Sequence, residues 1–220
     1  MTSADLAVAG AEANLYGILA EVLAFPTHEF GHLVESGFLQ MTVEKLSSEL
    51  PCEVQLPAGD LGPAGLSDTA LEAEYIRLFD APDRLPTPLY TGVYSARRRD
   101  AMEEILRIYR HFGLTVSADA HDLPDFVPTM LEFLRFLAEG TALASTRESR
   151  ERAMADLLER HLCPWAEHTR ERLAQREALP FYQSLVSTVA VLGAARLRQL
   201  RGSYPSLAGS AAPAPHRPSR

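Results

Sequence analysis

The residues with the clearest capacity for chemistry are His28, Glu29 and His32, which fit the H-E-x-x-H pattern. On a helix this spacing places two histidines on one face, where they can bind zinc, and it leaves the glutamate beside a zinc-bound water. The reaction would be metal-assisted hydrolysis, in which the glutamate activates that water. A zinc metallopeptidase is therefore one alternative for this chain.

The surroundings of the motif do not favour this alternative. The motif follows Pro26, which places it in the first turn of a helix, and Gly31 weakens that turn further. A longer zinc-protease pattern requires a glycine and a third histidine further along, but Glu35 and Phe38 stand at these positions. The favoured interpretation is an exposed helix start, with Glu29 near the positive end of the helix dipole.

No other residues form a recognisable catalytic or metal-binding pattern. Cys52 and Cys163 form no C-x-x-C pair, and His161 and His168 lie on either side of Pro164 and so do not share one helical face. The common glycine-rich nucleotide-binding motifs and the G-x-S-x-G nucleophile elbow are also absent. We expect no catalysis and no permanently bound metal or cofactor.

A short basic run, Arg97, Arg98 and Arg99, lies where a helix is expected to begin. The dipole of a helix disfavours cations at its start. A solvated face is the favoured interpretation, and contact with an anion or an acidic partner is the alternative.

Composition narrows the class of protein. With 220 residues, of which 46% are hydrophobic and 23% charged, the chain can bury one substantial core. Its net charge of -8 argues against a nucleic-acid partner, because such binders present a basic face. The two cysteines suggest no disulfide framework. No basic export signal opens the chain and no apolar run is long enough to cross a bilayer, so we expect a cytoplasmic protein without stable membrane insertion.

Helical periodicity dominates the sequence, and no segment alternates apolar and polar residues as a half-buried strand does. This predicts an all-α, single-domain helical bundle. Helices are expected over about 11–24, from 27, over 69–80, 95–113, 125–140 and 145–163, from 164, and over 181–200. The predicted helix-starting caps are Thr69 with Glu72, Ser95, Asp125, and Ser145 with Glu148, and the predicted terminators are Gly113 and Gly140.

Two segments are expected to lie outside this packing. Proline and glycine are frequent over 51–67, which predicts a long and mobile connection within a helical domain that spans 1–201. Residues 202–220 are rich in proline, alanine and serine and predict a disordered tail. The tail has two arginines and no acid, so the negative charge belongs to the helical domain.

Several short stretches, taken together and in order, resemble the TorD/DmsD/NarJ family of redox-enzyme maturation chaperones. The order and spacing of such features match the family across about 15–200. The matching stretches are Glu74-Tyr75-Ile76-Arg77-Leu78-Phe79-Asp80, Pro88-Leu89-Tyr90 with Tyr94, Tyr109-Arg110-His111-Phe112-Gly113-Leu114, Leu123-Pro124-Asp125-Phe126-Val127-Pro128, Leu131-Glu132-Phe133-Leu134 and His161-Leu162-Cys163-Pro164-Trp165. The details are most similar to the NarJ-like branch, which serves type II enzymes of the DMSO-reductase family. One departure is Phe126, where the family often has a histidine.

The resemblance implies an all-helical chaperone that is not an enzyme. It implies a partner, the immature apo catalytic subunit of a molybdenum oxidoreductase of the dimethylsulfide, ethylbenzene, chlorate, selenate or nitrate type. The chaperone would bind this client, for example at its N-terminal twin-arginine leader, until molybdenum bis-molybdopterin guanine dinucleotide has been inserted. It would act as a monomer or a dimer and bind no cofactor permanently itself.

A client leader is basic and partly apolar, so an acidic protein with an apolar groove can attract it and then bury its apolar face. The expected client-binding residues are five aromatic ones for the groove and three acidic ones beside it: Tyr75, Phe79, Tyr90, Tyr94 and Phe126, with Glu74, Asp125 and Glu132. For the aromatic residues at helical spacing, ordinary core packing is the competing interpretation. For the chain as a whole, a generic helical adaptor remains the second alternative beside the zinc peptidase.

Overall fold

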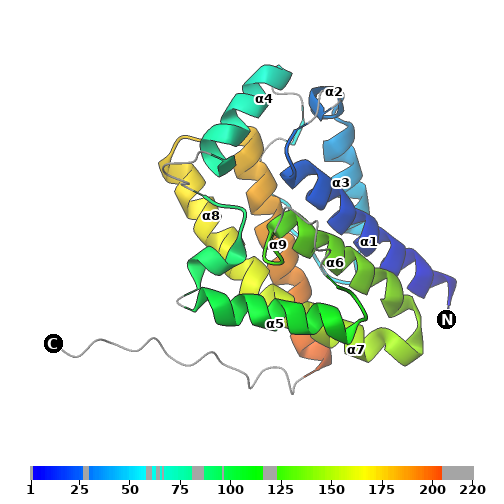
Figure 1. The fold of residues 1–220 in the computed structure, drawn as a ribbon. Coiled ribbons are helices and arrows are strands. Elements are labelled where there is room, and N and C mark those ends of the chain that lie inside the picture. Colours follow the sequence, from blue (N-terminus) through cyan, green and yellow to red (C-terminus); the bar gives the residue numbers. More distant parts are fainter. Residues whose placement is uncertain are drawn as a thin grey trace.

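The computed structural model describes residues 2–26, 30–57, 61–62, 65, 67–80, 87–95, 97–115 and 123–204. Figure 1 shows these segments as a group of packed helices. Within the described ranges the only extended pairing is one isolated antiparallel bridge between Tyr90 and Phe126. The all-α prediction is therefore confirmed.

The helices follow one another along the chain, with the longest connections between α3 and α4 and between α5 and α6. The α-helices are α1 (Ser3–Leu23), α2 (Phe30–Glu35), α3 (Phe38–Ser48), α4 (Asp68–Tyr75), α5 (Arg98–His111), α6 (Val127–Glu139), α7 (Ala144–Leu157), α8 (Cys163–Gln175) and α9 (Pro180–Ser203). Two π-helical turns, η1 (Ile76–Asp80) and η4 (Leu158–Leu162), extend α4 and join α7 to α8. Two 3-10 turns, η2 (Thr91–Tyr94) and η3 (Gly140–Ala142), complete the order.

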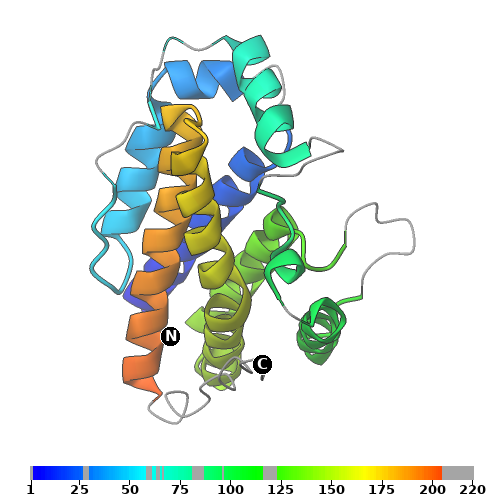
Figure 2. The same cartoon turned by 90° about the vertical axis from the view of Figure 1, so that its left-hand side faces the viewer.

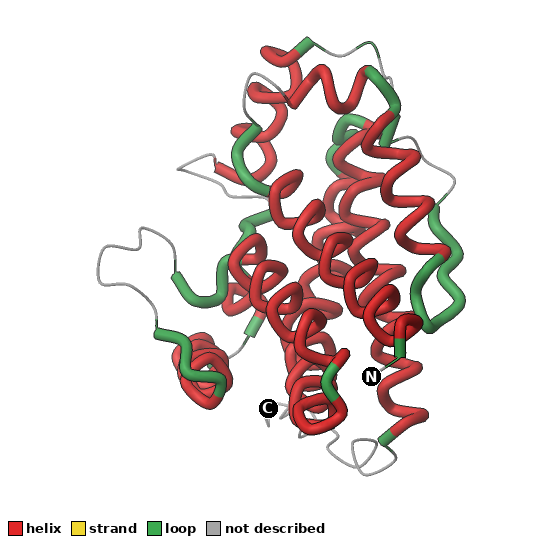
Figure 3. The backbone as a smooth tube through the Cα atoms, turned by 90° about the vertical axis from the view of Figure 1, so that its right-hand side faces the viewer, coloured by secondary structure: helices red, strands yellow, loops and turns green. Residues whose placement is uncertain are grey.

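The core forms where α1 packs along α6 and α8 packs along α9. Its largest fully buried side chains include Trp165 and Tyr182, and the indole nitrogen of Trp165 donates a hydrogen bond of 3.0 Å to the Pro88 carbonyl. This bond ties the segment before η2 to the core. Figures 2 and 3, from opposite sides, show α5 nearly end-on at the side of the bundle.

Helix α1 is long and apolar enough, by length and composition, to cross a membrane. Most of its apolar stretch is buried inside the protein, however, chiefly against α6. Leu15, Leu19 and Leu23 follow each other at four-residue spacing and are almost fully buried, as expected of a core helix. The expectation that no apolar run is long enough to cross a bilayer did not take α1 into account, in which only Asp5, Glu12 and Glu21 are charged.

The predicted helix caps were only partly correct. Gly113 has φ 76°, the left-handed conformation expected of a helix terminator. Ser67, rather than Thr69, caps α4 by accepting a hydrogen bond from the Ala70 amide. Helix α7 begins at Ala144 without a side-chain cap, so the prediction for Ser145 was wrong. Ser145 lies already inside the first turn, where its backbone is helical and cannot serve as the cap.

The prediction that a helix stops at Pro164 was also wrong. The chain continues from α7 through the π-helical turn η4 into α8, with Pro164 in the first turn of α8. A proline has no amide hydrogen to donate, and the first turn of a helix needs none from it. The wider π turn lets the chain pass this position without an interruption.

Some predictions lie outside the described residues. These are the expected helix start at Thr27, residues 58–60, 63–64 and 66 of the predicted connection, and residues 205–220 of the predicted tail. The tail was expected to begin at residue 202, but α9 continues to Ser203.

Candidate functional site

A groove lined by aromatic side chains lies where the end of α1, the turn η1 and the segment before η2 meet. Its volume is about 310 Å³. It is lined by Ala24, Phe25, Tyr75, Phe79, Asp80, Leu89, Tyr90 and Phe126. We call this feature the aromatic groove.

One wall of the aromatic groove is held by Tyr75. Its hydroxyl donates a 3.2 Å hydrogen bond to the carbonyl of Leu23, at the end of α1. Its ring meets Phe25 and Phe79 edge to face, with centroids 5.3 and 5.2 Å away. Tyr75 and Phe79 are buried, whereas Phe25 is 50% exposed and presents its ring to solvent.

The π-helical turn η1 sets the position of Phe79 and Asp80. The hydroxyl of Thr87 donates a 2.7 Å hydrogen bond to the Leu78 carbonyl, which fixes this turn to the segment that follows it in the fold. Phe79 packs against Tyr182 of α9, with ring centroids 5.6 Å apart. Asp80 is exposed at the end of the turn and is the charged residue among the described residues that line the groove.

The opposite wall is formed by Tyr90 and Phe126, whose ring centroids lie 5.2 Å apart. Backbone hydrogen bonds join the two segments: the Thr91 amide donates to the Asp125 carbonyl at 3.0 Å, and the Val127 amide donates to the Leu89 carbonyl at 2.8 Å. The two rings are therefore held side by side by main-chain atoms rather than by their own packing alone.

Asp125 lies behind this wall and is 0% exposed. Its Oδ2 accepts a 2.9 Å hydrogen bond from the Gly92 amide, and its Oδ1 has no hydrogen-bond partner. A Cβ on residue 92 would stand 2.7 Å from Oδ2, so only glycine allows this approach. The predicted N-cap role was wrong, because α6 starts at Val127 with Phe126 as its cap and Asp125 turns toward η2. Buried in this way, its carboxylate does not line the groove.

The structure separates the other expected client-binding residues from the groove. Glu74 binds Arg77 through two hydrogen bonds of 2.6 and 2.7 Å and also accepts one from the Leu179 amide at the start of α9. These bonds hold the pKa of Glu74 below its usual value despite its partial burial, which acts in the opposite direction. Glu132 is half-exposed on α6, 3.6 Å from Arg135. Tyr94 does not line the groove, and its ring lies against His168 of α8 with centroids 5.3 Å apart.

The structure thus brings together Tyr75, Phe79, Tyr90 and Phe126 of the predicted residues, and it adds members that the sequence analysis missed. Phe25 is the most informative of these, because an exposed phenylalanine directly before Pro26 has no role in the core. The feature of the sequence that could have indicated Phe25 is its position at the end of an apolar helix. Asp80 appeared in the motif but was not assigned to the groove.

The zinc-peptidase alternative depends on residues at the start of α2. His28 and Glu29 lie outside the described residues, while His32 is exposed on the six-residue helix α2. Gly31 packs closely on Asp68, since a Cβ on residue 31 would stand 1.8 Å from its Oδ1. Among the residues that the structure describes, no group of three or more histidine, cysteine or acidic side chains is placed to hold a metal ion.

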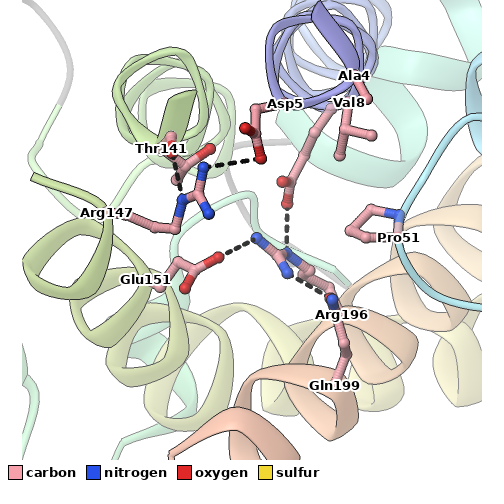
Figure 4. Close-up of a pocket in the computed structure, with 10 residues that line it drawn as sticks. Ala4, Asp5, Val8, Pro51, Thr141, Arg147, Glu151, Arg196 and Gln199 are labelled. Carbon is pink, nitrogen blue, oxygen red and sulfur yellow. Dashed lines mark hydrogen bonds and ion pairs between the residues drawn. The ribbon is translucent and has the colours of Figure 1, made fainter. Parts of the chain in front are cut away.

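A second cavity, of about 270 Å³, is lined by charged side chains from α1, α7 and α9 (Figure 4). Arg196 is buried and donates a 2.7 Å hydrogen bond to the buried Glu12. Glu151 lies 3.4 Å from the same guanidinium, and Arg147 binds Asp5 at 2.9 Å. Because these charges are paired with one another, the cavity serves the packing of three helices and does not resemble a site awaiting a ligand.

Comparison with known proteins identifies the family. Residues 43–171, more than half of the chain, match the family described as nitrate reductase delta subunit. The chain belongs to the nitrate reductase delta subunit family. This confirms the resemblance to the NarJ type of maturation chaperone.

Three relatives have been named as assembly chaperones. The chain is 28% identical over 187 residues to the perchlorate reductase assembly chaperone protein of Dechloromonas aromatica (strain RCB), covering 80% of this chain and 84% of the relative. It is 34% identical over 149 residues to the chlorate reductase assembly chaperone protein of Ideonella dechloratans, covering 64% and 77%. The corresponding protein for selenate reductase in Thauera selenatis is 32% identical over 145 residues, covering 63% and 75%. None of these matches supports the zinc-peptidase alternative.

The part that matches the nitrate reductase delta subunit family contains most of the aromatic groove. Tyr75, Phe79, Tyr90 and Phe126 all lie within residues 43–171, whereas Phe25 precedes them. The groove is thus built mainly from the region that defines the family.

Proposed function

We propose that this protein is a cytoplasmic, system-specific assembly chaperone for a molybdenum oxidoreductase of the perchlorate, chlorate or selenate reductase kind. It binds the immature catalytic subunit, assists insertion of the molybdopterin cofactor and keeps the client from export until insertion is complete. The observation that carries this proposal is the aromatic groove within the family-defining region. The cofactor belongs to the client, and the chaperone contributes binding and performs no chemical step.

The groove suits a peptide with apolar side chains next to a basic one. Aromatic rings bury a large area and lose little conformational freedom on binding, so Phe25, Tyr90 and Phe126 can hold an apolar segment. Asp80, the charged residue of the lining, attracts a cation at the edge of the groove. The net charge of -8 steers basic segments toward the protein over a longer range. An N-terminal leader of the client has both properties.

The set of proposed contact residues differs from the set that the sequence suggested. Tyr90, Phe126, Phe25 and Asp80 line accessible parts of the groove, and the buried Tyr75 and Phe79 form the wall behind Phe25. The carboxylates of Glu74 and Asp125 act as supports for the groove by accepting hydrogen bonds from the backbone amides of Leu179 and Gly92. Glu132 and Tyr94 lie elsewhere and are not proposed as groove contacts.

A matched pair of phenylalanine variants tests the groove. Phe25 is 50% exposed in the groove and Phe38 is 54% exposed on α3, outside it. We expect Phe25→Ala to weaken binding of a labelled leader peptide of the client about tenfold, because a buried phenylalanine contributes roughly 1.5 kcal/mol or more. Phe38→Ala should leave the affinity, measured by fluorescence anisotropy, within about twofold, the scatter expected outside an interface hot spot. Equal losses in both variants would remove the groove from the proposal.

Purification of the complex tests the identity of the client and distinguishes the chaperone from a generic helical adaptor. Affinity purification from the native cytoplasm, followed by mass spectrometry and a molybdenum assay, should recover one large oxidoreductase subunit that still carries its leader. Recovery of unrelated helical or soluble partners, with no oxidoreductase among them, would favour the generic adaptor.

A further inference from the structure

The aromatic groove presents an apolar ring and an acid to solvent. Phe25 is 50% exposed, Asp80 is exposed at the end of η1, and Tyr90 and Phe126 are partly exposed on the opposite wall. Exposed apolar surfaces of this kind attract unrelated apolar partners as well as their own ligand. A cover that leaves when the client arrives would protect such a groove.

The chain contains a segment with the composition of such a cover. Residues 212–218 have the sequence Ala-Pro-Ala-Pro-His-Arg-Pro, and we call them the proline segment. Proline fixes its own φ and disfavours the helical conformation in the residue before it. Six of these seven residues are prolines or directly precede one, so the composition favours the extended polyproline II conformation. A segment that is already restricted in this way loses little conformational entropy when it docks.

The proline segment matches the groove in shape and in charge. Pro215 and Pro218 form a P-x-x-P pattern, and extended segments with this pattern dock in grooves lined by aromatic rings. Arg217 lies inside the pattern, and Asp80 lines the groove. Residues 205–220 contain two arginines and no acid, whereas the whole chain has a net charge of -8. The groove thus offers aromatic faces to the prolines and a carboxylate to the arginine.

The fold fixes the point from which this part of the chain departs. The Tyr204 hydroxyl donates a 2.7 Å hydrogen bond to Glu151 of α7, and the Arg152 guanidinium lies 5.2 Å from the centroid of the Tyr204 ring. The groove lies near the other end of α9, because Phe79 packs against Tyr182 with ring centroids 5.6 Å apart. In Figure 2, α9 (orange) runs along the length of the bundle.

The chain that follows Tyr204 is long enough to return to the groove. Between Tyr182 and Ser203 the helix rises by about 32 Å, at about 1.5 Å per residue. Pro215 and Pro218 follow Tyr204 by eleven and fourteen residues. At about 3.1 Å per residue in polyproline II, these two prolines can lie about 34 and 43 Å from Tyr204, and a fully extended chain reaches further. The proline segment can therefore reach the groove of its own molecule.

We propose that the proline segment docks in the aromatic groove of the same chain and covers it until the client displaces it. The inference rests on the proposed function, because it makes the segment a competitor of the client leader at the same site. Docking within one molecule needs little intrinsic affinity, since a short tether holds the segment at an effective concentration in the millimolar range. The segment thereby sets the affinity that a client must exceed to occupy the groove.

Photo-crosslinking in the full-length protein tests where the proline segment lies. p-Benzoylphenylalanine in place of Phe25 probes the groove, and the same amino acid in place of Phe38 probes the exposed face of α3 outside it. Irradiation should join position 25 to the proline segment in a product with the mass of a monomer, identified by mass spectrometry of the peptides. Position 38 should give none of this product, and an excess of the client's leader peptide should suppress it at position 25.

A charge exchange tests the contact between Asp80 and Arg217. Asp80→Arg alone and Arg217→Glu alone should each reduce the crosslink from position 25, because each variant places like charges together. The double variant Asp80→Arg, Arg217→Glu should restore it. Circular dichroism should show unchanged helicity in all three, since Asp80 is exposed and Arg217 follows the last described helix.

Binding of the client's leader peptide tests the competition. Arg217→Glu should tighten this binding about three- to tenfold, the change expected when a tethered competitor with an effective concentration a few times its Kd is removed. Arg198→Glu is the matched control, because it changes the net charge equally at an exposed position of α9 outside the groove and the proline segment. It should change the affinity by less than about twofold, through long-range attraction alone. Equal tightening in both variants would overturn the proposal.

The outcomes distinguish this proposal from the proposed function. If leader binding responds to Phe25→Ala but position 25 gives no crosslink to the proline segment, or no more than position 38, the groove stands and the cover is wrong. Crosslinks found only between two chains would overturn docking within one molecule. If the crosslink forms within one chain but leader binding ignores Phe25→Ala, the segment docks there, while displacement by the client and the proposed client site are both wrong.

Discussion

At the scale of single residues, burial decides which acidic groups support the fold and which can meet a partner. Asp125 and Glu132 were both expected beside the groove, yet the first is completely buried and the second is half-exposed beside Arg135. A buried carboxylate that accepts an amide hydrogen bond holds its surroundings in place. An exposed carboxylate in a loose ion pair contributes little to stability.

Replacement of Asp125 should therefore act on stability. Asp125→Ala leaves the Gly92 amide without its partner and should lower the free energy of unfolding by about 1–3 kcal/mol, the cost of an unsatisfied buried donor. Asp125→Asn keeps an oxygen acceptor and should cost less. Glu132→Ala should stay within about 0.5 kcal/mol of the wild type. Urea unfolding of the three variants measures these differences, and an unchanged Asp125→Ala variant would contradict the supporting role.

His161 gives a pH dependence of known sign. Burial lowers the pKa of this imidazole from its ordinary 6.5, although Glu104, at 3.8 Å, and Asp125 act to raise it and Arg160 acts to lower it. The unfolded chain therefore takes up a proton at this residue more readily than the folded one. Stability attributable to His161 is full above pH 6.5 and is lost as the pH falls through 6.5 toward the lower folded pKa.

The measurement compares the wild type with His161→Gln. Urea unfolding between neutral and mildly acidic pH should show a loss of stability in the wild type that is smaller in the variant. The comparison is needed because the buried Glu12, whose pKa is raised by burial, contributes with the opposite sign. Parallel pH profiles for the two proteins would show that His161 has no such effect.

At the scale of elements, a glycine at a helix end can be required by close packing rather than by its backbone conformation. Gly140 was predicted as a helix terminator, and α6 does end beside it. Its φ of -82° is one that any residue adopts, so the left-handed region is not involved. Instead, the side chain of Arg150 lies where a Cβ would stand, 2.0 Å from its Nε, and stacks 4.4 Å from the Phe136 ring.

Two glycine-to-alanine variants should therefore shift stability in opposite directions. Gly140→Ala displaces the Arg150 guanidinium from Phe136 and should destabilise the protein by about 1–2 kcal/mol. Gly10→Ala, within α1, places its Cβ in open space and should stabilise it by about 0.5–1 kcal/mol. Thermal unfolding of both variants gives the comparison. Stabilisation by both would mean that Arg150 relocates without loss.

The elements also show what the sequence could predict. Periodic apolar positions gave the helices α1, α6 and α9 because their buried stripes are long, and Gly113 was correct because a positive φ favours glycine. The predicted cap Thr69 was wrong, since several polar residues near a helix start qualify as caps and the structure uses Ser67. No local pattern in the sequence indicates the π turns η1 and η4.

The site was predicted only in part. Tyr90 and Phe126 were assigned to one groove, but Tyr94, four residues after Tyr90, lies outside it because η2 turns the chain.

At the scale of the whole molecule, a buried ion pair joins its two ends. Glu12 of α1 and Arg196 of α9 are separated by 184 positions and lie 2.7 Å apart, away from water. The neighbouring Tyr204 hydroxyl binds Glu151 of α7 at 2.7 Å. These charged contacts fix the relative positions of the first and last helices around the core.

Removal of one partner from this pair should be costly. Arg196→Met leaves Glu12 buried without its partner and should lower the free energy of unfolding by about 3–5 kcal/mol. The double variant Glu12→Leu, Arg196→Met removes both charges and should recover most of that loss. Urea unfolding of the single and double variants forms the cycle. Additive losses would show that the two residues act independently.

The main-chain bridge between Tyr90 and Phe126 has a consequence for how members of this family can diverge. The bridge depends on the amides and carbonyls of Leu89, Thr91, Asp125 and Val127, so it survives a change of side chain at positions 90 and 126. Mutations at these two positions can therefore alter the chemistry of the wall without dismantling it. Under the proposed function, exchange of these two rings changes which client segment the groove accepts, and reciprocal grafting of the pair between relatives is expected to transfer recognition without redesign of the scaffold.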